Sequence, residues 1–317
     1  MGTVVKDGSG QRDAGSDARA MTLGTAYGLA AYLMWGLFPL YWKALSYVPA
    51  TQILAHRIVW AFAFTVLIAV GSRKSGAFRD LLADRKRLLS TIAAGALVSA
   101  NWGIYIWAVN DGRIVETSLG YYLNPLVSVI LGGVALRERI DRGIKLATAA
   151  AAVGVIVLAL SYGRIPWVSL VLALTFATYS LVKKLAGLDA VVGMVAETAA
   201  VFPLAFGFLL FRHGAGDGAF WNSGVKDTVL LALAGPVTAI PLLAFAAGLK
   251  RIPLSRMGFL QYVSPSLQLF LGVVVYGEAF SGTHAIGFGT VIAALAIYLS
   301  TRKTARRIEQ GGTEARR

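Results

Sequence analysis

The chain has 317 residues, of which 56% are hydrophobic, and a mean hydropathy of +0.65, which is far too apolar for a soluble domain of this length. It contains no cysteine, which excludes disulfides, thiolate catalysis and cysteine-ligated metal sites. A net charge of +14 would suit a nucleic-acid-binding protein, but the positions of the basic residues along the chain indicate a membrane protein instead.

Residues 1–21 form a polar tail, and no apolar core or small-residue cleavage site precedes Thr22, so we expect no removable signal peptide. Apolar windows of about 20 residues then recur, each long enough to cross a hydrocarbon core about 30 Å thick. They predict ten membrane-spanning helices, at residues 24–45, 51–71, 89–109, 114–136, 143–162, 165–182, 190–211, 228–248, 254–276 and 282–300. A second polar and basic tail, residues 301–317, follows the last span.

The basic residues predict the orientation of the spans. With the N-terminus placed in the cytoplasm, 24 of the 30 Lys and Arg residues fall in cytoplasmic segments and five in outer segments, while Arg57 lies inside a span. Such an excess is typical of the cytoplasmic side of a membrane protein. We therefore expect both termini in the cytoplasm, a location in the inner (cytoplasmic) membrane, and no nucleic-acid partner.

A spacing of 140 residues relates the two halves of the chain. The stretch YYLNPLVSVILGGVALRE (121–138) aligns without gaps with QYVSPSLQLFLGVVVYGE (261–278). The matched residues include Tyr122 and Tyr262, Pro125 and Pro265, and Glu138 and Glu278. Chance similarity between apolar helices is the alternative, but matched Tyr, Pro and Glu in one register favour duplication.

Each half holds five predicted spans, in residues 22–162 and 163–300. Since five is odd, the second copy must enter the membrane from the opposite side. Inverted repeats of this kind are found in many secondary transporters, whose substrate sites lie near the midplane between the repeats. The predicted fold is therefore an all-α integral membrane protein with ten transmembrane helices in two five-helix inverted repeats.

Polar side chains lie on one face of each of the two matched segments. They are Tyr121, Asn124 and Ser128 in the first segment and, 140 residues later, Gln261, Ser264 and Gln268 in the second. Pro125 and Pro265 each deprive a backbone carbonyl of its helical hydrogen bond, although they bend their helices whatever the function. Polar groups at membrane depth are tolerated where they face protein or a wet cavity. The two segments are thus predicted to form facing walls of a central substrate site.

Asn101 and Trp102 lie near the middle of the third span, about 18 Å along the helix. The Asn101 amide either bonds a neighbouring helix or lines the cavity, and both alternatives stay open. Trp102 either packs against other helices or stacks on a flat substrate. We include both residues among the candidate substrate-binding residues.

Arg57 and Glu197 are the oppositely charged residues deep in the predicted spans, and 140 positions separate them. A lone charge at such depth costs at least about 2.5–3.5 kcal/mol and is a functional candidate by default. One alternative is a static ion pair that holds the two repeats together. The other is a role in coupling and gating, in which Glu197 carries a proton or contacts a cationic group and Arg57 marks the opposite gate.

Several motifs also carry a family resemblance. They are WGLFPLYWK (35–43), HR (56–57), NWGIYIWAVN (101–110), ETSLGYYLNPL (116–126) with GGVALRER (132–139), and GFLQYVSP (258–265) with YGE (276–278). In this order and spacing they resemble the RarD family, part of the EamA group of the drug/metabolite transporter superfamily. The resemblance covers roughly residues 22–300. It implies ten helices in two inverted repeats, an inner-membrane location and transport of a small molecule, and it implies no particular substrate.

We therefore expect a secondary transporter whose partners are a small-molecule substrate and the lipid bilayer, with a homodimer left open. A membrane enzyme would need a denser set of reactive groups than the deep residues His56 and Glu197 supply, such as a zinc-binding HExxH motif or a Ser/His pair. A channel or a structural membrane subunit is the remaining alternative, but the sequence has no filter motif and its polar lining is discontinuous. No catalytic residue, metal site or cofactor is expected.

Overall fold

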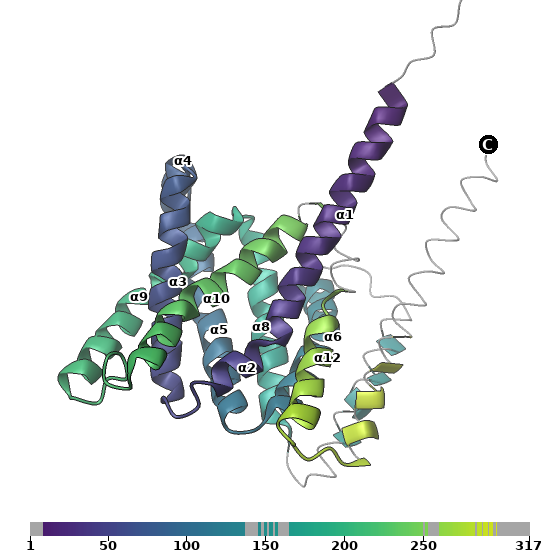
Figure 1. Ribbon diagram of the computed structural model, residues 1–317. Helices are drawn as coiled ribbons and strands as arrows, with labels where there is room; N and C mark the ends of the chain where they lie inside the picture. Colours follow the sequence, from purple (N-terminus) through teal and green to yellow (C-terminus); the bar gives the residue numbers. More distant parts are fainter. Residues whose placement is uncertain are drawn as a thin grey trace, which may run out of the picture.

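The computed structural model describes residues 9–136, 165–249, 251–252 and 260–282, with short pieces of 145–157 and 284–296. The regular structure of these residues is entirely helical, and most of the helices pack side by side in a bundle (Figure 1). The helices are α1 (Ser9–Gly36), α2 (Phe38–Lys43), α3 (Ala50–Gly71), α4 (Ser75–Ala83), α5 (Arg85–Asn110), α6 (Ile114–Leu136), α8 (Trp167–Ala186), α9 (Ala190–Gly214), α10 (Val225–Leu249) and α12 (Val263–Phe270), followed by a π-helical turn, η1 (Leu271–Val275).

Five helices in the described residues are long and apolar enough to cross a membrane by length and composition. They are Arg19–Lys43, Ala50–Gly71, Arg85–Asn110, Ala190–Gly214 and Val225–Gly248. Shorter apolar helices cover Trp167–Lys183 and Val263–Val275. This agrees with the predicted all-helical membrane fold. The spans predicted at 143–162 and 282–300 lie largely outside the described residues.

The first predicted span differs from the structure at both ends. The helix already begins at Ser9, inside the predicted polar tail, and the N-terminal part of α1 extends beyond the bundle (Figure 1). Toward the other end, α1 stops at Gly36 and α2 starts at Phe38, with Pro39 in its first turn. Proline has no backbone N–H to donate to the preceding turn, which explains why one predicted span became two helices.

The second matched segment differs as well. Pro265, predicted at the middle of a span, lies in the first turn of α12, which begins at Val263. A proline is tolerated there because the first N–H groups of a helix have no partner within it. The backbone carbonyl of Gln261, four residues earlier, accepts a hydrogen bond from the Ser264 N–H at 3.3 Å. In contrast, Pro125 lies inside α6, whose bounds match the predicted span of 114–136.

The helices follow the 140-residue spacing seen in the sequence. α3 and α9 begin at Ala50 and Ala190, and α5 and α10 begin at Arg85 and Val225. Packing mostly joins one half to the other: α1 packs against α10 and α12, α3 against α9 and α10, and α5 and α6 against α8. The two halves therefore share one interior.

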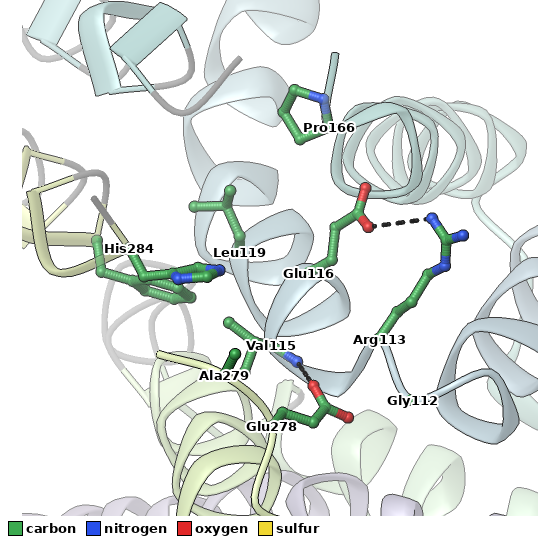
Figure 2. Close-up of a pocket in the computed structure, with 10 residues that line it drawn as sticks. Gly112, Arg113, Val115, Glu116, Leu119, Pro166, Glu278, Ala279 and His284 are labelled. Carbon is green, nitrogen blue, oxygen red and sulfur yellow. Dashed lines mark hydrogen bonds and ion pairs between the residues drawn. The ribbon is translucent and has the colours of Figure 1, made fainter. Parts of the chain in front are cut away.

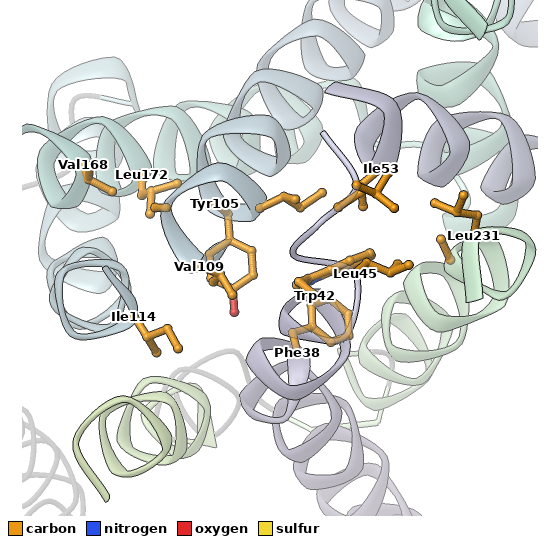
Figure 3. Close-up of a cluster of buried hydrophobic side chains, with 14 of the residues drawn as sticks. Phe38, Trp42, Leu45, Ile53, Tyr105, Val109, Ile114, Val168, Leu172 and Leu231 are labelled. Carbon is orange, nitrogen blue, oxygen red and sulfur yellow. The ribbon is translucent and has the colours of Figure 1, made fainter. Parts of the chain in front are cut away.

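That interior contains a buried apolar cluster to which both halves contribute (Figure 3). Its side chains come from α2, α3, α5 and α6 in the first half and from α8 and α10 in the second. They include Phe38, Trp42, Leu45, Ile53, Tyr105, Val109, Ile114, Val168, Leu172 and Leu231. Of the candidate site residues, Tyr121 packs against this cluster, and Arg57 lies over its rings of Phe38 and Trp42.

Candidate functional site

Arg57, in the first turns of α3, is the central charged residue of the first half. Its side chain is buried, with 2% exposure, among aromatic rings. The guanidinium carbon lies 4.1 Å from the centre of the Trp102 ring, 5.0 Å from that of Trp42 and 5.6 Å from that of Phe38. The negative faces of such rings attract a cation, each contributing about 0.5–2 kcal/mol. The aromatic rings of α2 and α5 thus stabilise the positive charge of Arg57 but do not neutralise it.

Several hydrogen-bonding groups in this aromatic surrounding have no partner among the described residues. They are Nε and Nη1 of Arg57, Nε1 of Trp42 and the hydroxyl of Tyr105. Figure 3 shows Trp42 and Tyr105 pointing into the same interior. Buried polar groups are nearly always hydrogen-bonded, because leaving one unpaired costs about 1–3 kcal/mol. A cluster of unpaired donors is therefore a candidate binding site for an acceptor.

Glu197, the matched residue of α9, has different surroundings. Its Oε1 and Oε2 lie 2.8 and 3.1 Å from Nζ of Lys183 in α8, and the Tyr179 hydroxyl donates to Oε2 at 2.9 Å. Lys183 also donates to the Tyr179 hydroxyl at 2.7 Å, which closes a three-membered network. The ion pair of Glu197 is therefore with Lys183 in its own half, and the alternative of a direct pair with Arg57 does not hold in this structure.

Asn101 connects two helices. It is fully buried in α5, and its Nδ2 donates to the Leu172 carbonyl at 3.0 Å and to Oγ1 of Thr175 at 2.8 Å, both in α8. On its other side, the Tyr121 hydroxyl donates to Oδ1 of Asn101 at 3.4 Å. The bond to a neighbouring helix, one of the two alternatives for this amide, is thus present. Contact with a substrate stays a prediction for both residues.

Of the polar residues of the second matched segment, Gln268 contacts α1. Nε2 of Gln268 donates to the Trp35 carbonyl and to Oγ of Ser264, both at 3.2 Å, while Oε1 of Gln268 has no partner among the described residues. Ser264 and Gln268 are buried, as is Asn124 in α6, whereas Gln261 is half-buried. The role of this stripe in substrate binding stays a prediction.

α6 and α12 do pack against each other, as facing walls would. The contacts between them include residues outside the predicted stripes. Oγ of Ser118 donates to the Pro265 carbonyl at 2.7 Å, and the rings of Tyr122 and Tyr262 stack with centres 6.0 Å apart. The side chains of Pro125 and Ser128, and residues Glu138 and Arg302–Arg317, lie outside the described part of the structure.

A cavity of about 210 Å³ lies beside the first turn of α6, away from the Arg57 cluster (Figure 2). It is lined by Gly112, Arg113, Val115, Glu116, Leu119, Pro166, Glu278, Ala279, His284 and Phe288. Its two carboxylates bind helix starts. Glu278 accepts the N–H groups of Ile114 and Val115, both at 2.9 Å, and Glu116 accepts the Val168 N–H at 3.2 Å. Glu116 therefore caps the start of α8 and not that of its own helix.

Arg113, the remaining charged residue of this cavity, is also paired. Nε of Arg113 lies 2.7 Å from Oδ2 of Asp111, and Nη1 lies 3.6 Å from Oε2 of Glu116. The hydrogen bond to Asp111 raises the pKa of the Arg113 guanidinium above its ordinary value. Since the charged groups of this cavity already bind protein, the cluster around Arg57 is the stronger candidate for a ligand.

Four residues of these networks were not among the predicted site residues: Trp42, Tyr105, Tyr179 and Lys183. Lys183 lies one residue past the predicted span of 165–182, but α8 continues to Ala186 and includes it. Its spacing of four residues from Tyr179 was the available signal, since such residues share a helix face. Tyr105 belongs to the predicted span of 89–109, and only 3% of it is exposed.

Comparison with known proteins gives one consistent family. The model of the EamA-like transporter family matches residues 22–160. The uncharacterized transporter YojE of Bacillus subtilis is 45% identical over 284 residues, which cover 87% of this chain and 93% of the relative. Protein RarD of Streptomyces exfoliatus is 45% identical over 285 residues, 90% of each chain. Chloramphenicol-sensitive protein RarD of Pseudomonas aeruginosa is 33% identical over 261 residues, 81% of this chain and 87% of the relative.

The fold is also found in a solved crystal structure. That structure superposes with a TM-score of 0.59 at 20% identity, covering 87% of this chain and 96% of the other. The sequence relatives extend over most of both chains, and their family agrees with the apolar helices described above. The chain therefore belongs to the RarD family of EamA-like membrane transporters.

Proposed function

We propose that the protein is a secondary transporter that moves a small molecule across the cytoplasmic membrane through a site at Arg57. The observation that carries this proposal is the buried guanidinium of Arg57, which has N–H groups without a partner among the described residues. Natural membrane proteins place such charges where they bind substrates or ions. The helices that surround it belong to an interior shared by the two halves, where transporters built from inverted repeats bind their substrates.

The proposed mechanism is alternating access. The helices of one half pack mainly on helices of the other, so a rocking of one half against the other would change which end of the shared interior is open. The paired carboxylate of Glu197 is the candidate for coupling this motion to a proton gradient. Arg57 and Glu197 then have separate roles, ligand binding and coupling.

The proposed orientation has both termini in the cytoplasm. Two contacts support the division of the segments between the two sides of the membrane, because each joins segments that the basic residues place on the same side. Lys74 lies 2.6 Å from Oδ1 of Asp189, and both belong to segments assigned to the cytoplasm. On the opposite side, Nζ of Lys43 donates to the Asn110 carbonyl at 3.4 Å.

Counterflow in proteoliposomes tests the transport proposal. Solutes that raise the melting temperature of the purified protein are selected first, from amino acids, nucleosides, amines and drugs. Chloramphenicol is included because it appears in the name of the Pseudomonas aeruginosa relative. If the protein is a carrier, proteoliposomes loaded with unlabelled solute should transiently accumulate the labelled solute above its equilibrium level. A channel would only equilibrate the label, and equilibration without overshoot for every solute would refute the proposal.

A further inference from the structure

We infer that the group bound at Arg57 is a carboxylate, so that the substrate is a small organic acid with a single negative charge. This inference rests on the proposed function and specifies the substrate class of the same site. Three independent features of the surroundings of Arg57 support it: the charge balance, the kind of unpaired group, and the way the rings stack.

The charge balance of the interior leaves one positive charge. Away from the helix ends, the described spans carry Arg57 and Glu197, and Lys183, in the last turn of α8, is the counter-ion of Glu197. Lys183 and Glu197 neutralise each other at 2.8 Å. A buried charge without a counter-ion is costly, whereas a hydrogen-bonded pair recovers much of that cost. A ligand with a single negative charge would make the interior neutral.

The unpaired groups are donors of hydrogen bonds. Nε and Nη1 of Arg57 and Nε1 of Trp42 can only donate, and the Tyr105 hydroxyl can donate. A carboxylate has about four lone-pair positions and only accepts, so it complements such a group of donors. An ammonium group or a second N–H donor would leave the same groups unpaired.

The aromatic rings lie close to the guanidinium carbon of Arg57 and leave its Nε and Nη1 without a partner among the described residues. Trp102 approaches to 4.1 Å from the guanidinium carbon, and Trp42 lies at 5.0 Å. Rings contact a guanidinium through its flat faces, whereas its N–H bonds point outward in its plane. Two parallel N–H groups are the usual partners of a carboxylate, which they bind in a bidentate manner. The aromatic surroundings also favour an organic acid over an inorganic anion.

The test uses the wild-type protein in lipid nanodiscs with matched pairs of ligands. Each pair consists of an acid and its neutral amide: phenylacetate and phenylacetamide, and lactate and lactamide. Thermal shift and tryptophan fluorescence report binding. We expect a saturable shift with at least one acid and about 10- to 100-fold weaker binding of its amide, because hydrogen bonds to charged groups are lost. Sodium chloride and sodium phosphate at equal ionic strength should produce no such shift.

Variants locate the effect at Arg57. Arg57→Gln should abolish the shift caused by the acid, and Arg57→Lys should weaken it, because lysine keeps the charge but lacks the planar pair of N–H groups. Arg113→Gln is the matched control. Arg113 also lies over a tryptophan, 5.1 Å from the centre of the Trp107 ring, but its charge is paired with Asp111. That variant should bind the acid like the wild type.

Equal binding of acid and amide, equal shifts with inorganic anions, binding by none of the acids, or unchanged binding to Arg57→Gln would each overturn the inference. If Arg57→Gln does not fold, the comparison of acids and amides on the wild type decides. Counterflow separates this inference from the proposed function. Overshoot with a neutral solute alone would leave the transporter proposal intact and refute the carboxylate site, whereas overshoot with no solute would refute the transporter proposal itself.

Discussion

The network of Glu197, Lys183 and Tyr179 links a buried acid to a base that is itself 34% exposed at its side chain, while the Glu197 side chain is only 6% exposed. Breaking a fully buried pair costs about 3–5 kcal/mol, because the remaining charge stays unpaired. Exposed pairs contribute less than about 1 kcal/mol. The partial exposure of Lys183 places this pair between the two cases, and we expect about 1–3 kcal/mol.

A double-mutant cycle measures this pair. Glu197→Gln and Lys183→Met should each lower the melting temperature of the purified protein, and the double variant should regain part of the loss, since neither charge is then left alone. Arg87→Met, which breaks the exposed pair with Asp84, is the control and should change little. If Glu197 couples transport to a proton gradient, gradient-driven uptake should stay lost in the double variant. Full recovery of that uptake would assign Glu197 a purely structural role.

Among the helices, the closest approaches occur at two glycines that lie 140 residues apart. A Cβ atom on Gly95 of α5 would lie 2.4 Å from the Glu197 carbonyl oxygen in α9. On Gly235 of α10 it would lie 2.3 Å from the Trp60 carbonyl carbon in α3. Both neighbours are backbone atoms, which cannot move aside as a flexible side chain would. Each half therefore uses a glycine to bring a helix against the other half.

Alanine substitutions test these contacts. Gly95→Ala and Gly235→Ala should each destabilise the protein by about 1–3 kcal/mol or reduce its folded yield, because the added methyl forces two backbones apart. Gly207→Ala is the matched control within α9, where an added Cβ meets no atom within 4 Å. There alanine should be neutral or stabilising by up to about 1 kcal/mol. Thermal unfolding in detergent distinguishes the three variants, and equal stability of all three would contradict the close approach.

At the scale of the whole molecule, sidedness is the property with the widest consequences. The contact between Lys74 and Asp189 and the contact between Lys43 and Asn110 join segments at opposite ends of the bundle. The absence of native cysteine makes the two ends accessible to single-cysteine labelling. Gly216 is a poor position for such a probe because its φ of +80° disfavours any side chain.

We therefore choose Ala77 in α4 and Ser223 before α10, which are both exposed. In intact cells, Ser223→Cys should react with an impermeant maleimide. Ala77→Cys should react only after the membrane is permeabilised. A gel shift of the labelled protein, measured in intact and in permeabilised cells, reports the reaction at each position. This pattern of labelling fixes the orientation. Labelling of Ala77→Cys in intact cells would reverse it.

Helix bounds were predictable where apolar length alone decides them, as for α6 and α3. Local backbone chemistry decided the rest: Pro39 divided the first span, and Pro265 sits in a first turn instead of mid-helix. For the site, the positions of Arg57 and Glu197 deep within the predicted spans identified them as buried charges. These positions did not identify their partners. Partners depend on where helices end and how they rotate, and Lys183 became one only because α8 continues past the predicted end.

The hydrogen bonds from Ile114 and Val115 to Glu278 have a consequence for biogenesis. The group that completes the start of α6 lies 164 positions after Ile114, so it leaves the ribosome long after α6 itself. Until then two N–H groups at that helix start must bond to water or lipid headgroups. The first half cannot reach its final form as a separate folding unit. A chain released before residue 278 should therefore remain incompletely folded and open to proteolysis at the segment that precedes α6.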